Sequence, residues 1–194
     1  GIFVEAISNP RIIVSDIPKL VEIANTANIP LILDSTMATP ILLNAKALGV
    51  HVIVSSTTKY LAANTGVIGG VVVDLGNYDW KICKSEDVKS AAGKFHHFGF
   101  IERVRRHGLH NGGGSASPMN AFLTAVGLET LAVRMTAHCN NAMKLAEYFE
   151  SNSSVTKVHY PGLVSHSQHA IAKEIFNGGF GGILSIELSS QTQA

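Results

Sequence analysis

Two short apolar runs, each ending in polar side chains, constrain the fold of this chain more than any other feature. Residues 31–33 are Leu-Ile-Leu and lead into Asp34, while residues 52–54 are Val-Ile-Val and lead into a hydroxyl-rich stretch that reaches Lys59. Uninterrupted apolar runs of this length are typical of strands buried on both faces. In open α/β sheets, ligands bind beyond the carboxyl ends of such strands. We therefore expect Asp34 and Lys59 to face one crevice.

The segments around these runs alternate between strand and helix patterns. A strand is expected at 2–4, a helix near 15–28, a second crossover after Thr39-Pro40, and another buried strand at 67–73. Strand-helix-strand order favours right-handed crossovers. The pattern predicts an α/β fold, with a mostly parallel sheet flanked by helices.

The second half of the chain begins with a strong helix start. Ser117 has the residue type of an N-cap and Pro118 that of the first helical position. Helical spacing continues to about Glu150, which predicts one bent helix or two helices joined near Gly127. Residues 74–114 have no clear pattern, so we interpret them as a long surface excursion that is functional, flexible or contains a helix. The last elements expected are a strand, a helix and a strand, at 155–160, 167–176 and 182–188.

Composition and charge narrow the class of protein. The chain has 194 residues, of which 46% are hydrophobic, so it is long enough for one substantial core. A net charge of +1 gives no electrostatic case for nucleic acid as a partner. No apolar run has the length of a membrane span, and the first residues lack the basic region of a signal peptide. With only Cys83 and Cys139, we expect a cytoplasmic protein without a disulfide framework.

The polar residues at the strand ends suit pyridoxal 5'-phosphate. A lysine such as Lys59 can form a Schiff base with the aldehyde of that cofactor. A carboxylate such as Asp34 can keep the pyridine nitrogen protonated, so that the ring acts as an electron sink. Neighbouring hydroxyls can bind the phosphate. From spacing alone, a strand-end cap at Asp34 and a solvated Lys59 explain the same residues equally well.

Three other constellations are weaker. Ser56-x-x-Lys59 matches a serine-acylase motif, but the K-T-G and S-D-N tripeptides that accompany it do not occur. Two histidine pairs have spacings that could bind zinc, but no cysteine pair or H-E-x-x-H supports them, so no metal site is predicted. These pairs are His107 with His110, and His166 with His169. The glycines at 112–114 are interpreted as a flexible loop before a helix rather than a phosphate cradle.

A series of linked motifs resembles the Cys/Met-metabolism enzymes that use pyridoxal phosphate and have fold type I. The motifs run in the family's order from one end of the chain to the other. They include Ser8-Asn9-Pro10, Asp34-Ser35-Thr36, Ser56-Thr57-Thr58-Lys59-Tyr60, Gly127-Leu128-Glu129-Thr130-Leu131, Arg134-Met135, His138-Cys139, Asn141-Ala142 and Tyr160-Pro161-Gly162-Leu163. Within the family, Asn77-Tyr78-Asp79-Trp80 and the long excursion favour the O-acetylhomoserine sulfhydrylase branch.

The resemblance implies a role for each matching position. Lys59 is implied to be the Schiff-base lysine, and to move protons once substrate displaces it. Asp34 is implied to pair with the pyridinium nitrogen. Ser56 and Thr58 are implied to donate hydrogen bonds to the phosphate.

The resemblance also implies less central roles, and it has departures. Asn9 is implied to lie near the 3-oxygen of the cofactor and the substrate carboxylate, and Thr36 near the ring. Glu5 is implied to be an outer residue of the site. The family usually has histidine where this chain has Ser55, and a Gly-Gly-His-like run where it has residues 61–66.

The resemblance further implies a division of the chain and a reaction. Residues 1–132 correspond to the central part of the cofactor-binding large domain, and 133–194 to an interdomain helix and the start of a smaller α/β C-terminal domain. The implied reaction converts O-acetylhomoserine and sulfide, or a thiol, to homocysteine and acetate in methionine biosynthesis, in a homotetramer. A methionine γ-lyase, a cystathionine γ-synthase or lyase, and an inactive fragment of such an enzyme remain alternatives.

Overall fold

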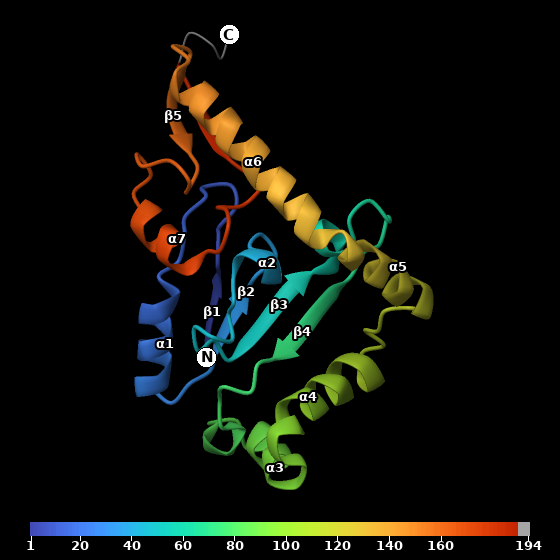
Figure 1. The fold of residues 1–194 in the computed structure, drawn as a ribbon. Helices are drawn as coiled ribbons and strands as arrows, with labels where there is room; N and C mark the ends of the chain where they lie inside the picture. Colours follow the sequence, from blue (N-terminus) through green and yellow to red (C-terminus); the bar gives the residue numbers. More distant parts are fainter. Residues whose placement is uncertain (190–194) are drawn as a thin grey trace.

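A four-stranded sheet lies at the centre of the computed structural model, which describes residues 1–189 (Figure 1). Its strands lie in the order β1-β2-β3-β4. The first three strands are parallel, and β4 is antiparallel to β3. The expected α/β fold with a mostly parallel sheet is therefore confirmed. The bounds are Ile2–Glu5 for β1, Leu31–Asp34 for β2, Val52–Ser56 for β3 and Gly70–Asp74 for β4.

The first crossover is helix α1, Ile17–Thr26. Its N-cap is Asp16, whose Oδ1 accepts a hydrogen bond of 3.0 Å from the Lys19 backbone N–H. The neighbouring Ser15 does not cap the helix. Its hydroxyl donates to the Glu5 carbonyl at 2.7 Å and so connects the loop before α1 to β1. The buried face of α1 packs into the main core beside the sheet.

The second crossover is shorter than its sequence pattern indicates. Helix α2 covers only Thr39–Leu42, and the chain becomes extended at Leu43. Both Leu42 and Leu43 are nevertheless buried in the main core. The apolar pattern after Thr39 thus predicted burial correctly, although most of it is not helical.

The strand predicted at 67–73 is present from Gly70 onward, but the prediction that this strand is buried is wrong. Strand β4 begins only at Gly70, and Val71, Val72 and Val73 are each 37–40% exposed. Within residues 1–189, β4 pairs with β3 on one side and with no strand on its other side. An apolar run is buried on both faces only when other elements cover it, and β4 lies at the edge of the described sheet.

The excursion is mostly helical. Its Trp80 stacks on Phe100 with ring centroids 4.3 Å apart and donates a 2.7 Å hydrogen bond from Nε1 to Asp74 Oδ2. Trp80 also packs against Val52 of β3, so the excursion covers part of the sheet. Its elements are η2 (Trp80–Ile82), α3 (Glu86–Phe95), η3 (His96–Phe98), α4 (Gly99–Val104) and η4 (Arg105–Asn111).

The long helical pattern forms two helices, α5 (Pro118–Glu129) and α6 (Leu131–Glu150). The Ser117 side chain accepts a 3.1 Å hydrogen bond from the Asn120 backbone N–H, which confirms the predicted cap. The helices meet at Thr130, three residues after the expected position. One stretch of α6 packs into the main core and a later stretch into a second cluster.

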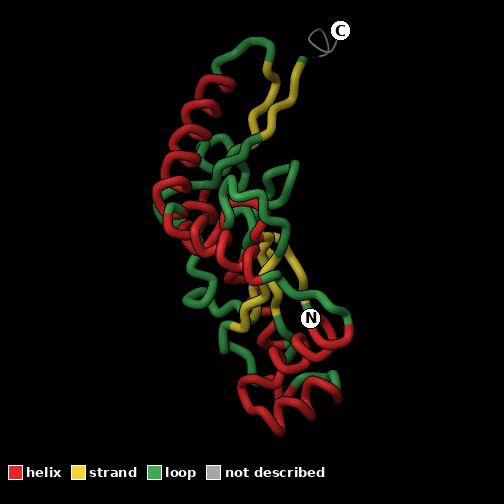
Figure 2. Tube along the Cα trace, turned by 90° about the vertical axis from the view of Figure 1, so that its right-hand side faces the viewer, coloured by secondary structure: helices red, strands yellow, loops and turns green. Residues whose placement is uncertain are grey.

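The second cluster joins α6 to a two-stranded antiparallel sheet of β5 (Val155–His159) and β6 (Ser185–Leu188). Helix α7, His169–Ile175, lies between these strands in the sequence. Figure 2 shows the small sheet beside α6 and the larger sheet at another level along the molecule. The domain division at 132/133 stays a prediction, and residues 190–194 of its second part lie outside the described residues.

Candidate active site

Lys59 lies on a short π-helical turn directly after β3, which we call the lysine turn (η1, Thr57–Leu61). The backbone leaves helical geometry at Lys59 itself, with φ −91° and ψ −121°. The Thr57 N–H donates to the Gly69 carbonyl at 2.9 Å, which ties the start of the turn to the chain entering β4. The Lys59 side chain is exposed and makes no hydrogen bond or ion pair with any residue in 1–189.

Asp34 and Ser56 come together at the carboxyl ends of β2 and β3 through Thr36. The Asp34 Oδ1 atom accepts a 2.8 Å hydrogen bond from the Thr36 N–H. In turn, Thr36 Oγ1 accepts a 2.9 Å hydrogen bond from the Ser56 N–H. The expected convergence of polar residues beyond adjacent parallel strands is therefore present for this trio.

The two predicted phosphate ligands have different environments. Thr58 Oγ1 accepts a 3.0 Å hydrogen bond from the Gly69 N–H and donates one of 3.3 Å to the Gly69 carbonyl. The Ser56 hydroxyl makes no hydrogen bond within the described residues. Ser56 is thus free to meet a ligand, whereas Thr58 would have to exchange its long bond to Gly69.

Glu5 is the last residue of β1, and Asn9 follows this strand in the chain. Glu5 pairs in register with Asp34, and the peptide N–H that follows it donates to the Asp34 carbonyl at 2.9 Å. Asn9 lies exposed in a tight turn after β1, in which Ser8 Oγ accepts from the Ile13 N–H at 3.0 Å. No hydrogen bond in the described part of the chain joins Asn9 to Asp34 or Lys59.

The surroundings of Lys59 include residues to which the sequence assigned no role. A hollow beside the lysine turn is formed by side chains from that turn and from α6. The Tyr60 ring meets the His138 ring edge-on with centroids 5.3 Å apart, and burial raises the pKa of the Tyr60 phenol. In the sequence, Arg134, His138 and Asn141 of α6 are notable only as members of family motifs. More than 70 positions separate them from Lys59, so no local pattern connects them with it. The lining residues are Lys59, Tyr60, Ala63, Asn64, Arg134, Ala137, His138 and Asn141.

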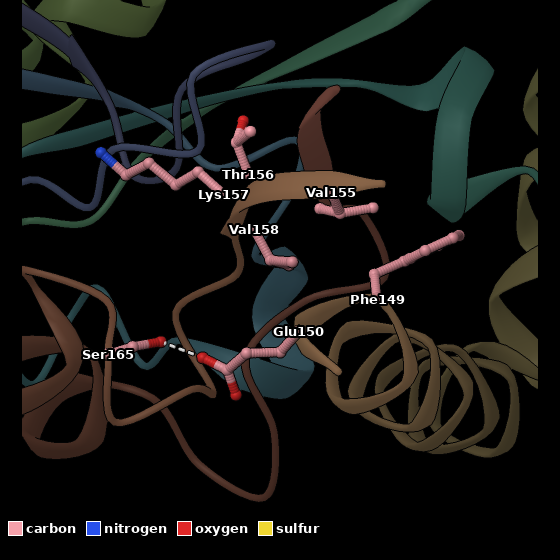
Figure 3. A pocket seen from close by; sticks show the side chains of 7 residues that line it. All are labelled: Phe149, Glu150, Val155, Thr156, Lys157, Val158 and Ser165. Atoms are coloured by element: carbon pink, nitrogen blue, oxygen red, sulfur yellow. Dashed lines mark hydrogen bonds between the residues drawn. The ribbon is translucent and has the colours of Figure 1, made fainter. Parts of the chain in front are cut away.

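A second hollow lies apart from these residues, between the end of α6 and β5 (Figure 3). Figure 3 shows Glu150 and Ser165 facing each other across it, joined by a 2.5 Å hydrogen bond from the serine hydroxyl. Lys157 extends away from this pair. None of the predicted site residues lines this hollow.

The pair His166 and His169 is engaged in local structure. His166 Nε2 donates to the Ile12 carbonyl at 3.1 Å, and burial lowers the pKa of its imidazole. His169 Nδ1 donates to the Pro161 carbonyl at 2.9 Å. Within residues 1–189, no group of three or more histidine, cysteine or acidic side chains is arranged to hold a metal ion. Over the same residues, no helix combines the length and apolarity needed to cross a membrane.

A mostly parallel α/β sheet with an acid, hydroxyls and a lysine at its strand ends is the architecture of an enzyme site. The pattern of the Cys/Met metabolism PLP-dependent enzymes matches residues 1–194, and the chain belongs to this family. The resemblance of its motifs is thereby confirmed, and pyridoxal phosphate is the cofactor of the family.

Similar proteins are named for more than one reaction. The chain is 40% identical to a cystathionine beta-lyase of Coxiella burnetii, over 96% of this chain and 43% of that protein. It is 33% identical to the O-acetyl-L-homoserine sulfhydrylase of Leptospira meyeri, over 96% of this chain and 46% of that protein. The solved O-acetylhomoserine sulfhydrylase of Wolinella succinogenes superposes with a TM-score of 0.87 at 39% identity, covering 98% of this chain and 53% of that one. The chain therefore spans about half the length of the relatives it matches.

The residues at the strand ends fit pyridoxal phosphate. The Asp34 Oδ2 atom, the Ser56 hydroxyl and the Lys59 amine make no hydrogen bond or ion pair within the described part of the chain. An unpaired carboxylate oxygen, a hydroxyl and an amine are the groups that a pyridine nitrogen, a phosphate and an aldehyde require. A matching Campylobacter jejuni structure, 35% identical with a TM-score of 0.83, contains N'-pyridoxyl-lysine-5'-monophosphate.

Proposed function

We propose that this chain supplies part of the active site of an enzyme that converts O-acetylhomoserine and sulfide, or a thiol, to homocysteine and acetate. The observation that carries the proposal is the hydrogen-bonded trio at the ends of β2 and β3, with Lys59 on the turn that follows. The sulfhydrylases among the relatives support the choice of reaction.

Asp34 and the hydroxyls would bind and orient the cofactor. Asp34 would hold the proton of the pyridine nitrogen, because Oδ1 is fixed by Thr36 while Oδ2 remains unpaired. Ser56 and Thr58 would donate to the phosphate. Thr36 and Asn9 would lie near the ring and its 3-oxygen. When bound, pyridoxal phosphate supplies an electron sink that stabilises negative charge at the substrate α-carbon.

Lys59 would bind the cofactor aldehyde and would then act as the acid and base. Its amine would take the proton from the substrate α-carbon and move protons at the β-carbon. Overall, the bond between Cγ and the acetate oxygen breaks, a bond between Cγ and the sulfur of hydrogen sulfide or the thiol forms, and the proton that sulfur loses is balanced by the departing acetate. The exposed Lys59 amine has the freedom that such movement requires.

An elimination reaction on the same scaffold is the second candidate. The 40% identity to a cystathionine beta-lyase favours it specifically. The purified protein would be assayed with O-acetylhomoserine with and without sulfide, and with cystathionine alone. Homocysteine that forms only when sulfide is present supports the sulfhydrylase. Release of 2-oxobutanoate without sulfide, or homocysteine from cystathionine alone, would instead identify a lyase.

The same proposal covers the location, the oligomeric state and the substrate class of the enzyme. We expect a cytoplasmic homotetramer that acts on small amino acids. Residues 1–194 expressed alone should have little or no turnover, because they span about half the length of the relatives. Robust sulfhydrylase activity from this chain alone would contradict that expectation.

A further inference from the structure

The lysine turn is held at both ends, and Lys59 lies between the two attachments. At the start, the Thr57 N–H donates to the Gly69 carbonyl at 2.9 Å, which connects the turn to the sheet. Near the other end, Arg134 of α6 donates from Nη1 to the Tyr60 carbonyl at 2.8 Å. That carbonyl belongs to the residue directly after Lys59. Lys59 itself is the position at which the backbone leaves helical geometry.

The other two guanidinium nitrogens of Arg134 are also engaged. Nη2 donates to the Gly127 carbonyl at 2.8 Å, and Nε donates to Thr130 Oγ1 at 3.0 Å. All three guanidinium nitrogens therefore make hydrogen bonds, which fixes the plane of the group. Gly127 and Thr130 lie at the junction of α5 and α6, so Arg134 links this junction to the lysine turn.

Close packing reinforces this link. A Cβ atom at Gly127 would lie 2.6 Å from the carbonyl carbon of Ala62, so α5 directly contacts the end of the lysine turn. The Tyr60 ring packs on His138, one turn of α6 beyond Arg134. A Cβ atom at Gly182 would lie 2.8 Å from the Tyr60 hydroxyl, so that ring is enclosed from a third direction.

We propose that Arg134 is a positioning residue for Lys59, a role that rests on the function proposed above. A side chain serving only the helix junction would need its bonds to Gly127 and Thr130. The third bond crosses 74 positions of sequence and ends on the residue that follows Lys59. By holding that carbonyl, Arg134 sets the direction in which the Lys59 amine leaves the turn and so its access to the cofactor aldehyde.

Cofactor uptake by three variants of the purified protein tests the proposal. Pyridoxal phosphate is titrated, the bound form is reduced with borohydride, and mass spectrometry counts the cofactor on Lys59. Arg134→Met should need at least about tenfold more cofactor for half-labelling, because it removes the charge-assisted hydrogen bond to the Tyr60 carbonyl together with both junction bonds. Arg134→Lys should lie between Arg134→Met and the parent protein, because one donor can still reach the turn. Thr130→Val removes two hydrogen bonds within the junction, the one from Arg134 Nε and one of 3.4 Å to the Gly127 carbonyl, but none to the lysine turn, and should label like the parent.

Three results would overturn the proposal. Arg134→Met could label like the parent, or Thr130→Val could be impaired as strongly as Arg134→Met. Circular dichroism could also show that both Arg134 variants are unfolded, which would make Arg134 a determinant of the whole fold. Expected instead are similar spectra and thermal midpoints for Arg134→Met and Thr130→Val.

Hydrogen exchange separates this inference from the proposed function. Without cofactor, the backbone amides of residues 57–62 should exchange about tenfold faster in Arg134→Met than in the parent, and unchanged in Thr130→Val. If the parent takes up no cofactor on Lys59, the proposed function fails, while exchange still decides whether Arg134 holds the turn. Equal exchange in the parent and Arg134→Met would reject the positioning role.

Discussion

Strands β2 and β4 have similar apolar side chains but opposite surroundings. In β2, Leu31 and Leu33 are fully buried, whereas the three valines of β4 are more than a third exposed. β2 is hydrogen-bonded to a strand on each side, and β4 to β3 alone among the described strands. An apolar run therefore indicates a strand, while the elements next to it decide how much of the strand is buried.

The two strands also contribute differently to the site. The end of β2 presents the Asp34 carboxylate, a group with chemistry of its own. The chain entering β4 contributes only the Gly69 peptide, which binds Thr57 and Thr58 at the start of the lysine turn. The buried strands thus carry the reactive side chains, and the edge strand supports them through its backbone.

The largest expected effect is on binding of the cofactor, and it distinguishes Lys59 from a lysine outside the site. Lys59→Ala should abolish the visible absorption band that appears on adding pyridoxal phosphate and survives dialysis, because Lys59 is the lysine of the turn that directly follows β3. Lys84→Ala, in the excursion near β4, is the matched control and should keep the band. A band of full strength in Lys59→Ala would exclude Lys59 as the attachment point.

The next effect tests the contrast in burial directly. Leu33→Ala should lower the free energy of unfolding by about 2–5 kcal/mol, because it leaves a cavity in the main core. Val72→Ala at the exposed edge should cost less than about 1 kcal/mol. Urea unfolding of both variants provides the comparison. Equal losses would mean that β4 is covered as fully as β2 in the protein.

A smaller effect concerns the attachment of the excursion beyond β4. Trp80→Phe keeps the ring stack with Phe100 but removes the hydrogen bond to Asp74 Oδ2, the last residue of β4. Losing a bond to a charged acceptor should cost about 1–3 kcal/mol. Trp80 is the single tryptophan, so the variant has no tryptophan fluorescence with which to follow unfolding. Thermal unfolding is therefore followed by circular dichroism. An unchanged midpoint would show that stacking alone attaches the excursion.

The smallest expected effect is a pH dependence of the free energy of unfolding, caused by His51 beside β2. His51 Nδ1 accepts a 2.7 Å hydrogen bond from the Leu31 N–H, and Nε2 donates to Asn25 Oδ1 at 3.1 Å. This pairing requires a neutral imidazole. Burial lowers the pKa of His51 below its ordinary value of 6.5, and the charge of Asp74 opposes this only in part.

The lowered pKa of His51 in the folded protein sets the direction in which stability changes with pH. Since the unfolded chain protonates His51 at higher pH than the folded one, the contribution to stability is complete above about pH 6.5. It declines as the pH falls through the lower folded-state pKa, by at most about 1.4 kcal/mol per pH unit. His51→Asn keeps an acceptor for Leu31 but does not titrate, so urea midpoints from pH 8 to 5 should fall less steeply. Parallel profiles for both proteins would rule out His51 as the source.

Particular residues show how far sequence patterns reach. The Ser117 cap follows from residue type alone, because its hydrogen bond spans three positions. The proximity of Asp34 to Ser56 follows from the rule that parallel strands end at one edge. The exposure of β4 did not follow, because burial depends on elements distant in the chain. Arg134 could not be assigned a role, because its contact with Tyr60 joins residues 74 positions apart.

The sequence by itself determined the family, the α/β alternation and the residue types that gather beyond β2 and β3. These depend on local periodicity and on motifs whose order is visible in the chain. Only the tertiary structure decided that β4 is an exposed edge, that the excursion packs through Trp80, and that α6 contacts the lysine turn. Those features depend on contacts between segments that are distant in the chain. No local sequence pattern identifies which side chains make such a contact.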